Sequence, residues 1–336
     1  MRVSKSCLSS VALVGVMTAS LMACSSDDGN DAATTEGVVA TVQNCDQTIT
    51  ISEPIEKAVA VNQPAVELLL SLGLQDRMAG YAMSDDDVLP DLEPARAQVQ
   101  PFDTEFPSFE TVLDREPDFA YATFDYTFTS EGIADRDKFT ELGIATYQSP
   151  SECGGQEAEQ SAPLTLDDQY AEIGEVAELF GVPAKGDELV ADLQQRAATA
   201  VTDLNAENVS LGWWYASTKT PYFAGCCGAP GLMTTAVGAN NAFDDSKQYW
   251  PEVSWESVLD RDPTVLVLAD LDRGDDGDSA AAKIAFLESD PVASQLTAVK
   301  NEWYIILNGT TMDPSIRNVD GTEQLANGLR ELGVAQ

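Results

Sequence analysis

The chain has 336 residues, with 18 basic and 56 acidic side chains, and its formal net charge is therefore −38 at neutral pH. A charge of this sign and size repels nucleic acids and anionic lipid surfaces, so it excludes binding that depends on phosphate contacts. The chain contains no histidine, which excludes the usual serine and cysteine triads, HExxH metal sites and imidazole-bound haem iron. A chain of this length is expected to form about two domains.

The first residues have the features of an export signal. Arg2 and Lys5 precede a short apolar stretch at 8–22 that is too short and too rich in small residues to span a membrane. The sequence LMAC at 21–24 is typical of a bacterial lipobox, which predicts a signal peptide at 1–23, a lipid on Cys24 and anchoring to the outer face of the cell membrane. An ordinary secretory signal is the alternative. Residues 24–39 are small, polar and acidic, as in a flexible tether.

Residues 40–182 are expected to form a first lobe in which strands and helices alternate. This order predicts a parallel sheet with helices on both faces. The predicted elements are a hairpin at 40–54, strands at 58–61, 77–82, 119–128 and 144–147, and helices at 65–74, 108–114, 136–142 and 165–180.

A long helix within 183–207 is expected to connect this lobe to a second one at 208–336. The segment is rich in Ala, Leu, Gln and Glu, which favour helix. The second lobe repeats the alternation, with strands at 209–215, 265–269 and 303–307 and helices at 232–238, 254–261, 280–287, 292–300 and 319–332. We therefore predict an α/β protein of two lobes with parallel sheets, joined by one long α-helix.

An internal repeat supports two similarly built lobes. PSFETVLDREPDFAYA at 107–122 matches EVSWESVLDRDPTVLVLA at 252–269 with a constant offset of 146 residues. In each copy a serine, Ser108 or Ser254, is suited to cap a short helix. Glu110 and Glu256 follow in the first turn, on the face opposite the apolar stripe.

Four cysteines belong to the predicted lobes. Cys45 and Cys153 stand in turn-rich contexts and, in an exported protein, are natural disulfide partners, with two free buried thiols as the alternative. Cys226 and Cys227 are adjacent and precede a helix with Pro230 at its start. A vicinal disulfide that stiffens the loop is the leading interpretation; a soft-metal site and a redox site are the alternatives.

Ligands of such folds bind at the carboxyl ends of parallel strands and between domains. The candidate ligand-binding residues at these ends are Asn62, Gln63, Tyr81, Phe124, Tyr126, Trp213, Trp214, Tyr215, Tyr222 and Arg317. Burial in a lobe core is the alternative for each ring. Arg317 is the candidate cation for a ligand carboxylate or phosphate, with a salt bridge at a helix start as the alternative. No catalytic or metal-ligating set is predicted.

Several stretches together carry a specific resemblance. They are AVAVNQPAVELLLSLGLQDRMAGYA, PSFETVLDREPD, LTLDDQYAEIGEVAELFGV, VGANNAFDD, WPEVSWESVLDRDPTVLVLAD and SIRNVDGTEQLANGLRELG. Over nearly the whole mature chain the sequence resembles the class III periplasmic-type binding proteins of ABC importers, the group that serves iron-siderophores, haem and vitamin B12. The resemblance implies two Rossmann-like lobes bridged by one helix, with ligand in the groove between them.

The resemblance also implies function and partners. We expect a monomeric solute-binding protein without intrinsic cofactor that delivers a ferric-siderophore-like chelate to a permease dimer and its ATPase; a corrinoid or other large cofactor is the alternative cargo. In this group, glutamates at the positions of Glu110 and Glu256 contact arginines of the permease. The alternative is that each acid only stabilises its helix by lying near the N-terminus. The sequence departs from many siderophore binders in having few basic residues for an anionic complex.

A function of a different class, a thiol-based redox or soft-metal protein that uses Cys226 and Cys227, is the remaining alternative. The absence of histidine and of a CxxC motif argues against it. We expect the organic shell of the cargo to be recognised by rings and amides.

Overall fold

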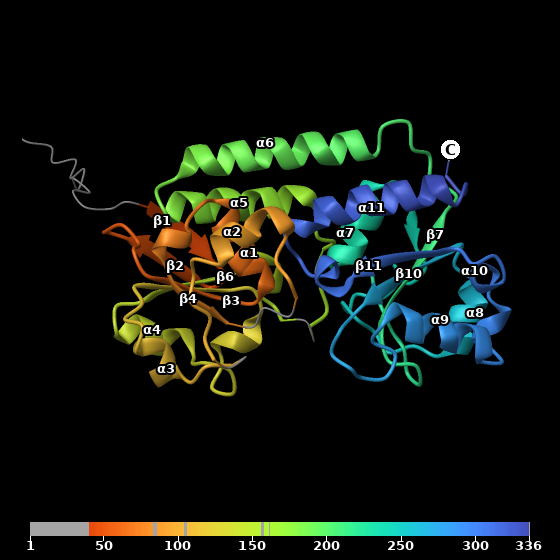
Figure 1. The fold of residues 1–336 in the computed structure, drawn as a ribbon, viewed down its shortest axis with the longest axis horizontal. Helices are drawn as coiled ribbons and strands as arrows, with labels where there is room; N and C mark the ends of the chain where they lie inside the picture. Colours follow the sequence, from red (N-terminus) through yellow and green to blue (C-terminus); the bar gives the residue numbers. More distant parts are fainter. Residues whose placement is uncertain (1–39, 83–85, 104–105, 156–157, 161, 336) are drawn as a thin grey trace, which may run out of the picture. The chain divides into compact units, whose positions relative to one another are not determined.

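The computed structural model describes residues 40–82, 86–103, 106–155, 158–160 and 162–335, which form two α/β lobes (Figure 1). The predicted signal peptide and tether, Cys24 included, lie outside these residues. In the part of the chain that the model describes, no helix is both long and apolar enough to span a bilayer.

The first lobe is organised around a sheet of four parallel strands. Their order is β4-β3-β5-β6, with bounds Ala58–Val61 for β3, Met78–Ala82 for β4, Phe119–Ala122 for β5 and Ala145–Gln148 for β6. The carboxyl ends of the four strands are level, because Val61 pairs with both Ala82 and Ala122, and Ala122 pairs with Gln148. The strands are short apolar runs because helices cover both faces of the sheet.

Two apolar clusters hold the helices of the first lobe on their faces. On one face lie α1 (Gln63–Ser71), α5 (Leu166–Leu179) and the antiparallel hairpin of β1 (Ala40–Asn44) and β2 (Gln47–Ile51). On the other lie α3 (Phe109–Leu113) and α4 (Arg136–Glu141), as Figure 1 shows. The short helix α2 (Glu93–Arg96) belongs to the connection after β4.

The hairpin is fastened to the carboxyl end of β6. Cys45 and Cys153 form a disulfide with Cα atoms 5.4 Å apart. Beside it the Asn44 side chain exchanges hydrogen bonds with the backbone of Gln148, accepting from its N–H at 2.9 Å and donating to its carbonyl at 2.7 Å. The short turn η4 (Pro150–Glu152) after β6 is therefore held at both ends, which matters because it carries part of the site described below.

The second lobe repeats this architecture. Its sheet has the order β11-β10-β7-β8, with β9 also on β7. The bounds are Ser210–Ala216 for β7, Tyr222–Phe223 for β8, Asn240–Asn241 for β9, Val265–Asp270 for β10 and Tyr304–Asn308 for β11. Only β8 runs antiparallel to its neighbour among these paired strands.

Helices again cover both faces of the second sheet. One face packs on α7 (Ala229–Ala236) and α11 (Arg317–Glu331), and the other on α8 (Trp255–Arg261), α9 (Ala280–Ser289) and α10 (Thr297–Lys300). Successive residues of β7 enter different apolar clusters. Trp213 packs in the cluster with α7 and α11, and Trp214 packs in the cluster with α8, α9 and α10. This is the period of two that a strand imposes on its side chains.

One helix joins the lobes. It is α6 (Pro183–Ala200), which packs along both α5 and α11 and is drawn along them in Figure 1. Arg196 of α6 forms ion pairs with Glu323, at 2.7 Å, and with Asp320, both on α11. The predicted connector at 183–207 is thus helical to Ala200 and continues as a turn and an irregular segment.

The repeated units occupy equivalent places as helix–strand pairs, α3 with β5 and α8 with β10. The hydroxyls of Ser108 and Ser254 accept hydrogen bonds from the N–H groups of Thr111 and Ser257, as the capping prediction required. The equivalence extends to side chains, because the Arg115 guanidinium lies 4.9 Å from the Phe102 ring and the Arg261 guanidinium lies 4.4 Å from the Phe243 ring.

One predicted element is wrong in its extent. The strand predicted at 119–128 ends at Ala122, and the 3₁₀ helix η3 (Asp125–Phe128) follows. The Asn62 side-chain oxygen accepts hydrogen bonds from Phe124 N–H and the Thr127 hydroxyl, each at 3.3 Å, so the chain turns here instead of continuing the ladder.

Candidate ligand-binding site

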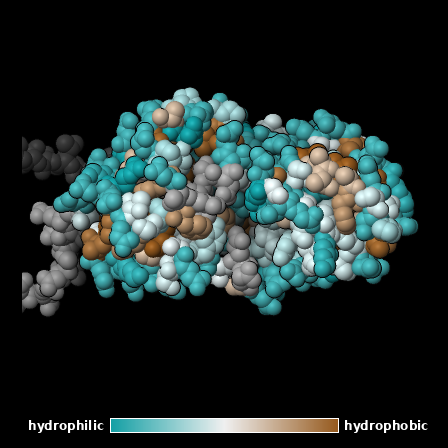
Figure 2. Space-filling model, turned by 60° about the horizontal axis from the view of Figure 1, so that its bottom comes forward, coloured by the Kyte–Doolittle hydropathy of each residue, from teal (hydrophilic) through white to brown (hydrophobic). Residues whose placement is uncertain are grey.

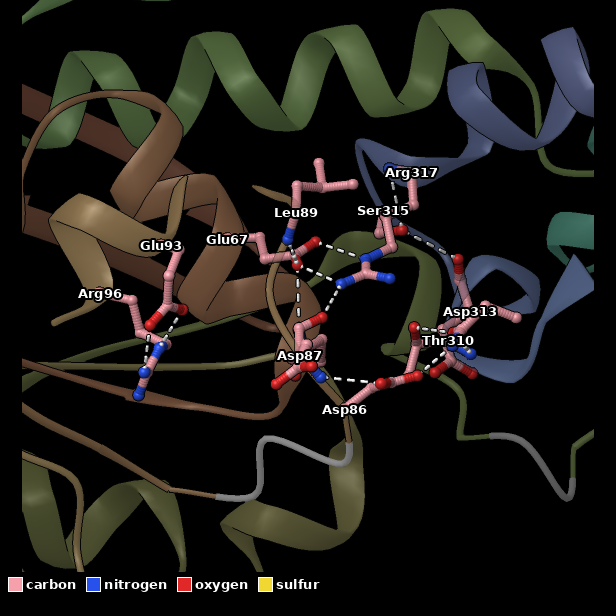
Figure 3. Close-up of polar contacts among 12 residues, drawn as sticks. Glu67, Asp86, Asp87, Leu89, Glu93, Arg96, Thr310, Asp313, Ser315 and Arg317 are labelled. Atoms are coloured by element: carbon pink, nitrogen blue, oxygen red, sulfur yellow. Dashed lines mark hydrogen bonds and ion pairs between the residues drawn. The ribbon is translucent and has the colours of Figure 1, made fainter. Parts of the chain in front are cut away.

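Polar contacts join the two lobes near the carboxyl ends of their strands. The Arg317 guanidinium donates to both Glu67 carboxylate oxygens, at 2.8 and 2.5 Å, and to the backbone oxygen of Asp87 at 2.6 Å (Figure 3). Asn308 donates to the Asp86 carboxylate in the same region. Gln169 of α5 donates to Asn318 of α11.

This arrangement corrects the role expected of Arg317. Its side chain is 8% exposed and that of Glu67 is 0% exposed, so the guanidinium is buried in an ion pair between the lobes. A bidentate pair of this kind uses the donors that a ligand carboxylate would need. The salt-bridge alternative is the correct one, although its partner comes from the other lobe.

The predicted roles of Trp213 and Trp214 are also wrong. Both side chains are 0% exposed. Trp213 donates to the Thr234 hydroxyl at 2.8 Å, and Trp214 packs edge-on against Trp255 at 4.8 Å. Because neighbouring strand residues point to opposite faces and helices cover both faces, each ring is enclosed by a different half of the lobe core.

Tyr215, the next residue of β7, is part of a partly exposed ring cluster. Its ring lies 4.7 Å from that of Trp250, and the Arg273 guanidinium lies 5.3 Å from the Tyr215 ring. Arg273 is 46% exposed and pairs with Asp278 at 2.7 Å. Tyr215 and Arg273 stand at the carboxyl ends of β7 and β10, where the fold places ligands.

Four candidates of the first lobe are buried: Asn62, Gln63, Tyr81 and Phe124. The Tyr81 hydroxyl accepts from Arg96 at 2.9 Å, and the Gln63 amide donates to Glu67 at 3.0 Å. Their expected direct contact with ligand is corrected to a supporting role, because all four side chains are buried and the polar ones among them hydrogen-bond within the lobe.

Two candidates keep accessible rings. Tyr126 is 39% exposed, and its ring stacks on that of Phe124 at a centroid distance of 5.3 Å. Tyr222 is partly exposed, and its hydroxyl donates to Glu252 at 2.9 Å.

A hollow between the lobes brings together residues that the sequence interpretation did not select. Glu152 comes from η4 of the first lobe, and Tyr249, Trp250 and Asp313 come from the second. The Tyr249 hydroxyl donates across the lobes to the Ser151 backbone oxygen at 2.8 Å. Glu152 follows the carboxyl end of β6, so the strand-end rule could have found it, whereas Tyr249 and Trp250 lie in a loop of no regular pattern.

The adjacent cysteines immediately precede Gly228, which lines this hollow. Cys226 and Cys227 form a disulfide, and Cys227 is buried. The Cys227 backbone oxygen accepts from Leu164 N–H at 3.1 Å, and Cys226 N–H donates to the Ser246 carbonyl at 2.9 Å. Across the described ranges no group of three or more Cys, Asp or Glu side chains could hold a metal ion. The disulfide joins two residues of a loop that backbone hydrogen bonds hold on both sides.

The two acids of the repeat lie on a largely hydrophilic surface. The face seen in Figure 2 is mostly hydrophilic, with apolar residues in separate patches. Glu110 and Glu256 are both exposed, each in the first turn of its helix.

Two parallel-sheet lobes, a single connecting helix and a hollow between the lobes define the two-lobe α/β fold of periplasmic binding proteins. Residues 59–309 match the model of the family described as periplasmic binding protein, and the chain belongs to that family. The redox alternative is set aside, because the family binds solutes and carries no intrinsic cofactor.

Individual relatives agree with this assignment. The vitamin B12-binding protein of Vibrio cholerae serotype O1 is 24% identical over 281 residues, which are 82% of this chain and 90% of that protein. A periplasmic binding protein from Veillonella parvula has a TM-score of 0.76 at 24% identity, covering 88% of this chain and 98% of that one. The structure of an ABC-type Fe3+-hydroxamate transport system from Saccharomonospora viridis has a TM-score of 0.71 at 24% identity, covering 87% and 99%.

Proposed function

We propose that this chain is the extracytoplasmic, lipid-anchored solute-binding component of an ABC importer, and that its cargo is a ferric-siderophore-like chelate. The observation that carries the proposal is the pair of partly exposed rings, Tyr215 and Trp250, near the carboxyl ends of the second-lobe strands, with Trp250 also lining the hollow between the lobes. Rings and amides suit the organic shell of a chelate. In the described part of the chain, no group of three or more cysteine, aspartate or glutamate side chains could hold a bare metal ion. A corrinoid or other large cofactor is the alternative cargo.

The relatives support this class of cargo. One of the similar structures is named for Fe3+-hydroxamate transport and one relative for vitamin B12, both large ligands with an organic shell. In this function the protein works as a monomer and hands its cargo to a permease dimer that is coupled to an ATPase.

Trp250 is the expected reporter of binding. A ferric chelate bound beside the Tyr215–Trp250 pair should quench tryptophan fluorescence, and Trp250→Phe should remove a large share of that quenching. Trp303→Phe is the matched control, because Trp303 immediately precedes β11 and lies at the opposite edge of the sheet. The measurement is a fluorescence titration with ferric hydroxamates, a corrinoid and free ferric ion, together with mass spectrometry of ligand that co-purifies from the host. Saturable binding of free ferric ion alone would contradict the proposal.

The anchor is expected to depend on one sulfur atom. Cys24→Ser should remove the acceptor of the lipid and release the protein from the membrane fraction, because the polar tether and the acidic domain supply no other membrane affinity. Cell fractionation with immunoblotting measures this, with Cys7→Ser as a control that should stay membrane-bound. A Cys24→Ser protein that remains with the membranes would show that the lipobox interpretation is wrong.

The exposed acids Glu110 and Glu256 are proposed to dock on cationic residues of the permease, one from each lobe. Their support is the matched position of the two carboxylates on equivalent, Ser-capped helices. Transport assays test this role, as set out in the Discussion.

A further inference from the structure

Glu152 stands out among the buried acids because no described residue forms a hydrogen bond or ion pair with its carboxylate. The residue is 0% exposed, and neither carboxylate oxygen has a hydrogen-bond partner within the described part of the chain. Buried carboxylates ordinarily accept several hydrogen bonds or pair with a cation, since burying one alone costs a large amount of free energy. Because such a group destabilises the fold, its presence in a native protein indicates a functional role.

Glu152 lines the hollow between the lobes. The hollow has a volume of about 10 Å³ and is partly open to solvent. A volume of about this size holds one water-sized group, so the hollow admits one small projecting group of a larger molecule and not a whole chelate. Trp250, in its wall, is also the partner of Tyr215, so the hollow adjoins the proposed chelate site.

The charge of the lining has one sign. The nine described residues around the hollow include two acids, Glu152 and Asp313, and no basic residue. Burial, followed by the charges of Asp313, Asp125 and Glu172, raises the pKa of Glu152 well above its ordinary value. Arg317 of the junction and Arg273 of the ring cluster form ion pairs with Glu67 and Asp278.

The aromatic rings beside the carboxylate also favour a positively charged ligand. Tyr249 and Trp250 line the hollow, and the faces of such rings attract ammonium groups. A metal ion is a poorer occupant, because no set of three or more metal-ligating acids or cysteines converges among the described residues.

One feature of the wall favours the opposite charge. The N-terminus of α7 contributes Gly228, Ala229 and Pro230, and helix N-termini attract anions. Pro230 has no N–H to donate, and Glu152 makes no hydrogen bond to this terminus. We therefore expect the negative charge of the Glu152 carboxylate to have a larger effect on the ligand than the N-terminus of α7.

We infer that Glu152 binds a protonated amine carried by the cargo, so that the protein selects cationic chelates over neutral and anionic ones. This inference rests on the proposed function and narrows its substrate class. It also explains how a binding protein with few cleft cations handles a chelate: the ligand brings the positive charge, and the protein supplies the carboxylate.

The test compares three ferric chelates that differ only at one end. Ferric desferrioxamine B has a terminal ammonium, its N-acetyl derivative is neutral there, and its N-succinyl derivative is anionic. Fluorescence titration of the native protein should rank them in that order. A charge-assisted hydrogen bond predicts that acetylation weakens binding about tenfold or more. Glu152→Gln keeps the shape of the side chain and should remove most of this preference while leaving the affinity for the N-acetyl chelate nearly unchanged.

A second measurement needs no ligand. Because Glu152 is buried without a partner, Glu152→Gln should raise the melting temperature of the ligand-free protein. Glu172→Gln is the matched control: this glutamate already accepts hydrogen bonds from Tyr121 and Ser149, at 2.7 and 2.8 Å, so its replacement should give no rise.

The outcomes separate the inference from the function. Equal binding of the three chelates, or preference for the anionic one, would overturn the cation selectivity and leave the chelate-binding function standing. A Glu152→Gln protein that melts lower and keeps the ammonium preference would also overturn it. Failure of all three chelates to bind, with saturable binding of a corrinoid, would overturn the siderophore cargo and the inference with it.

Discussion

Replacing both Glu110 and Glu256 by alanine is expected to reduce cargo uptake about tenfold or more while ligand affinity stays nearly unchanged. Both carboxylates are exposed, and each is in the first turn of a short helix that is equivalent between the lobes. Neither has an ion pair within the described chain, so removing them leaves no buried partner behind. The measurement is uptake of labelled chelate by cells that express the importer, together with a binding titration on the purified variant.

The same helices provide a matched control. Asp114 and Asp260 are also exposed acids at equivalent positions, but they lie at the other ends of α3 and α8. Replacing this pair by alanine changes the net charge by the same amount and should leave uptake near normal. Normal uptake by the Glu110→Ala/Glu256→Ala protein would contradict the docking role and leave the two glutamates with only a favourable interaction with the helix dipole.

Replacing Arg317 by methionine is expected to destabilise the protein by about 3–5 kcal/mol, the cost of leaving a buried charge without its partner. The Glu67 side chain is 0% exposed, and after the substitution the Gln63 amide and the Leu89 N–H are the donors that remain to it among the described residues. Since the pair joins the two lobes, the loss should also loosen the junction that Figure 3 shows. Chemical denaturation measures the change in the free energy of unfolding.

Two further variants test this explanation. Lys57→Met breaks an ion pair with exposed partners, 49% and 81%, and should change stability little. The double variant Glu67→Gln/Arg317→Met should recover part of the lost stability, because it removes the unpaired charge. If Arg317→Met were no less stable than Lys57→Met, the buried pair would have no special role.

The sequence by itself determined the architecture of this protein. Alternating helical and apolar strand patterns predicted two parallel sheets, and the repeat around Glu110 and Glu256 predicted that the lobes are alike. These features depend on spacing along a continuous stretch of chain, such as Ser108 capping a helix that feeds β5. Local patterns of this kind can be read without knowing what packs against them.

Most of the candidate site was decided by tertiary structure. The strand-end rule selected Tyr215, which lies near the carboxyl end of β7. It could not tell that helices on both faces of the sheet enclose Trp213 and Trp214. It selected Arg317 as a free cation because the partner, Glu67, lies 250 residues away in the other lobe.

The hollow around Glu152 likewise depends on contacts between segments that are distant in sequence. Whether a charged side chain meets a partner, solvent or an empty space depends on contacts between segments that are distant in sequence, and no local pattern reports those contacts. Sequence spacing therefore determined which residues reach the ligand-binding edge of each sheet. Packing of one lobe against the other decided which of them, Glu152 and Trp250 included, face the site, and which, like Arg317, hold the lobes together.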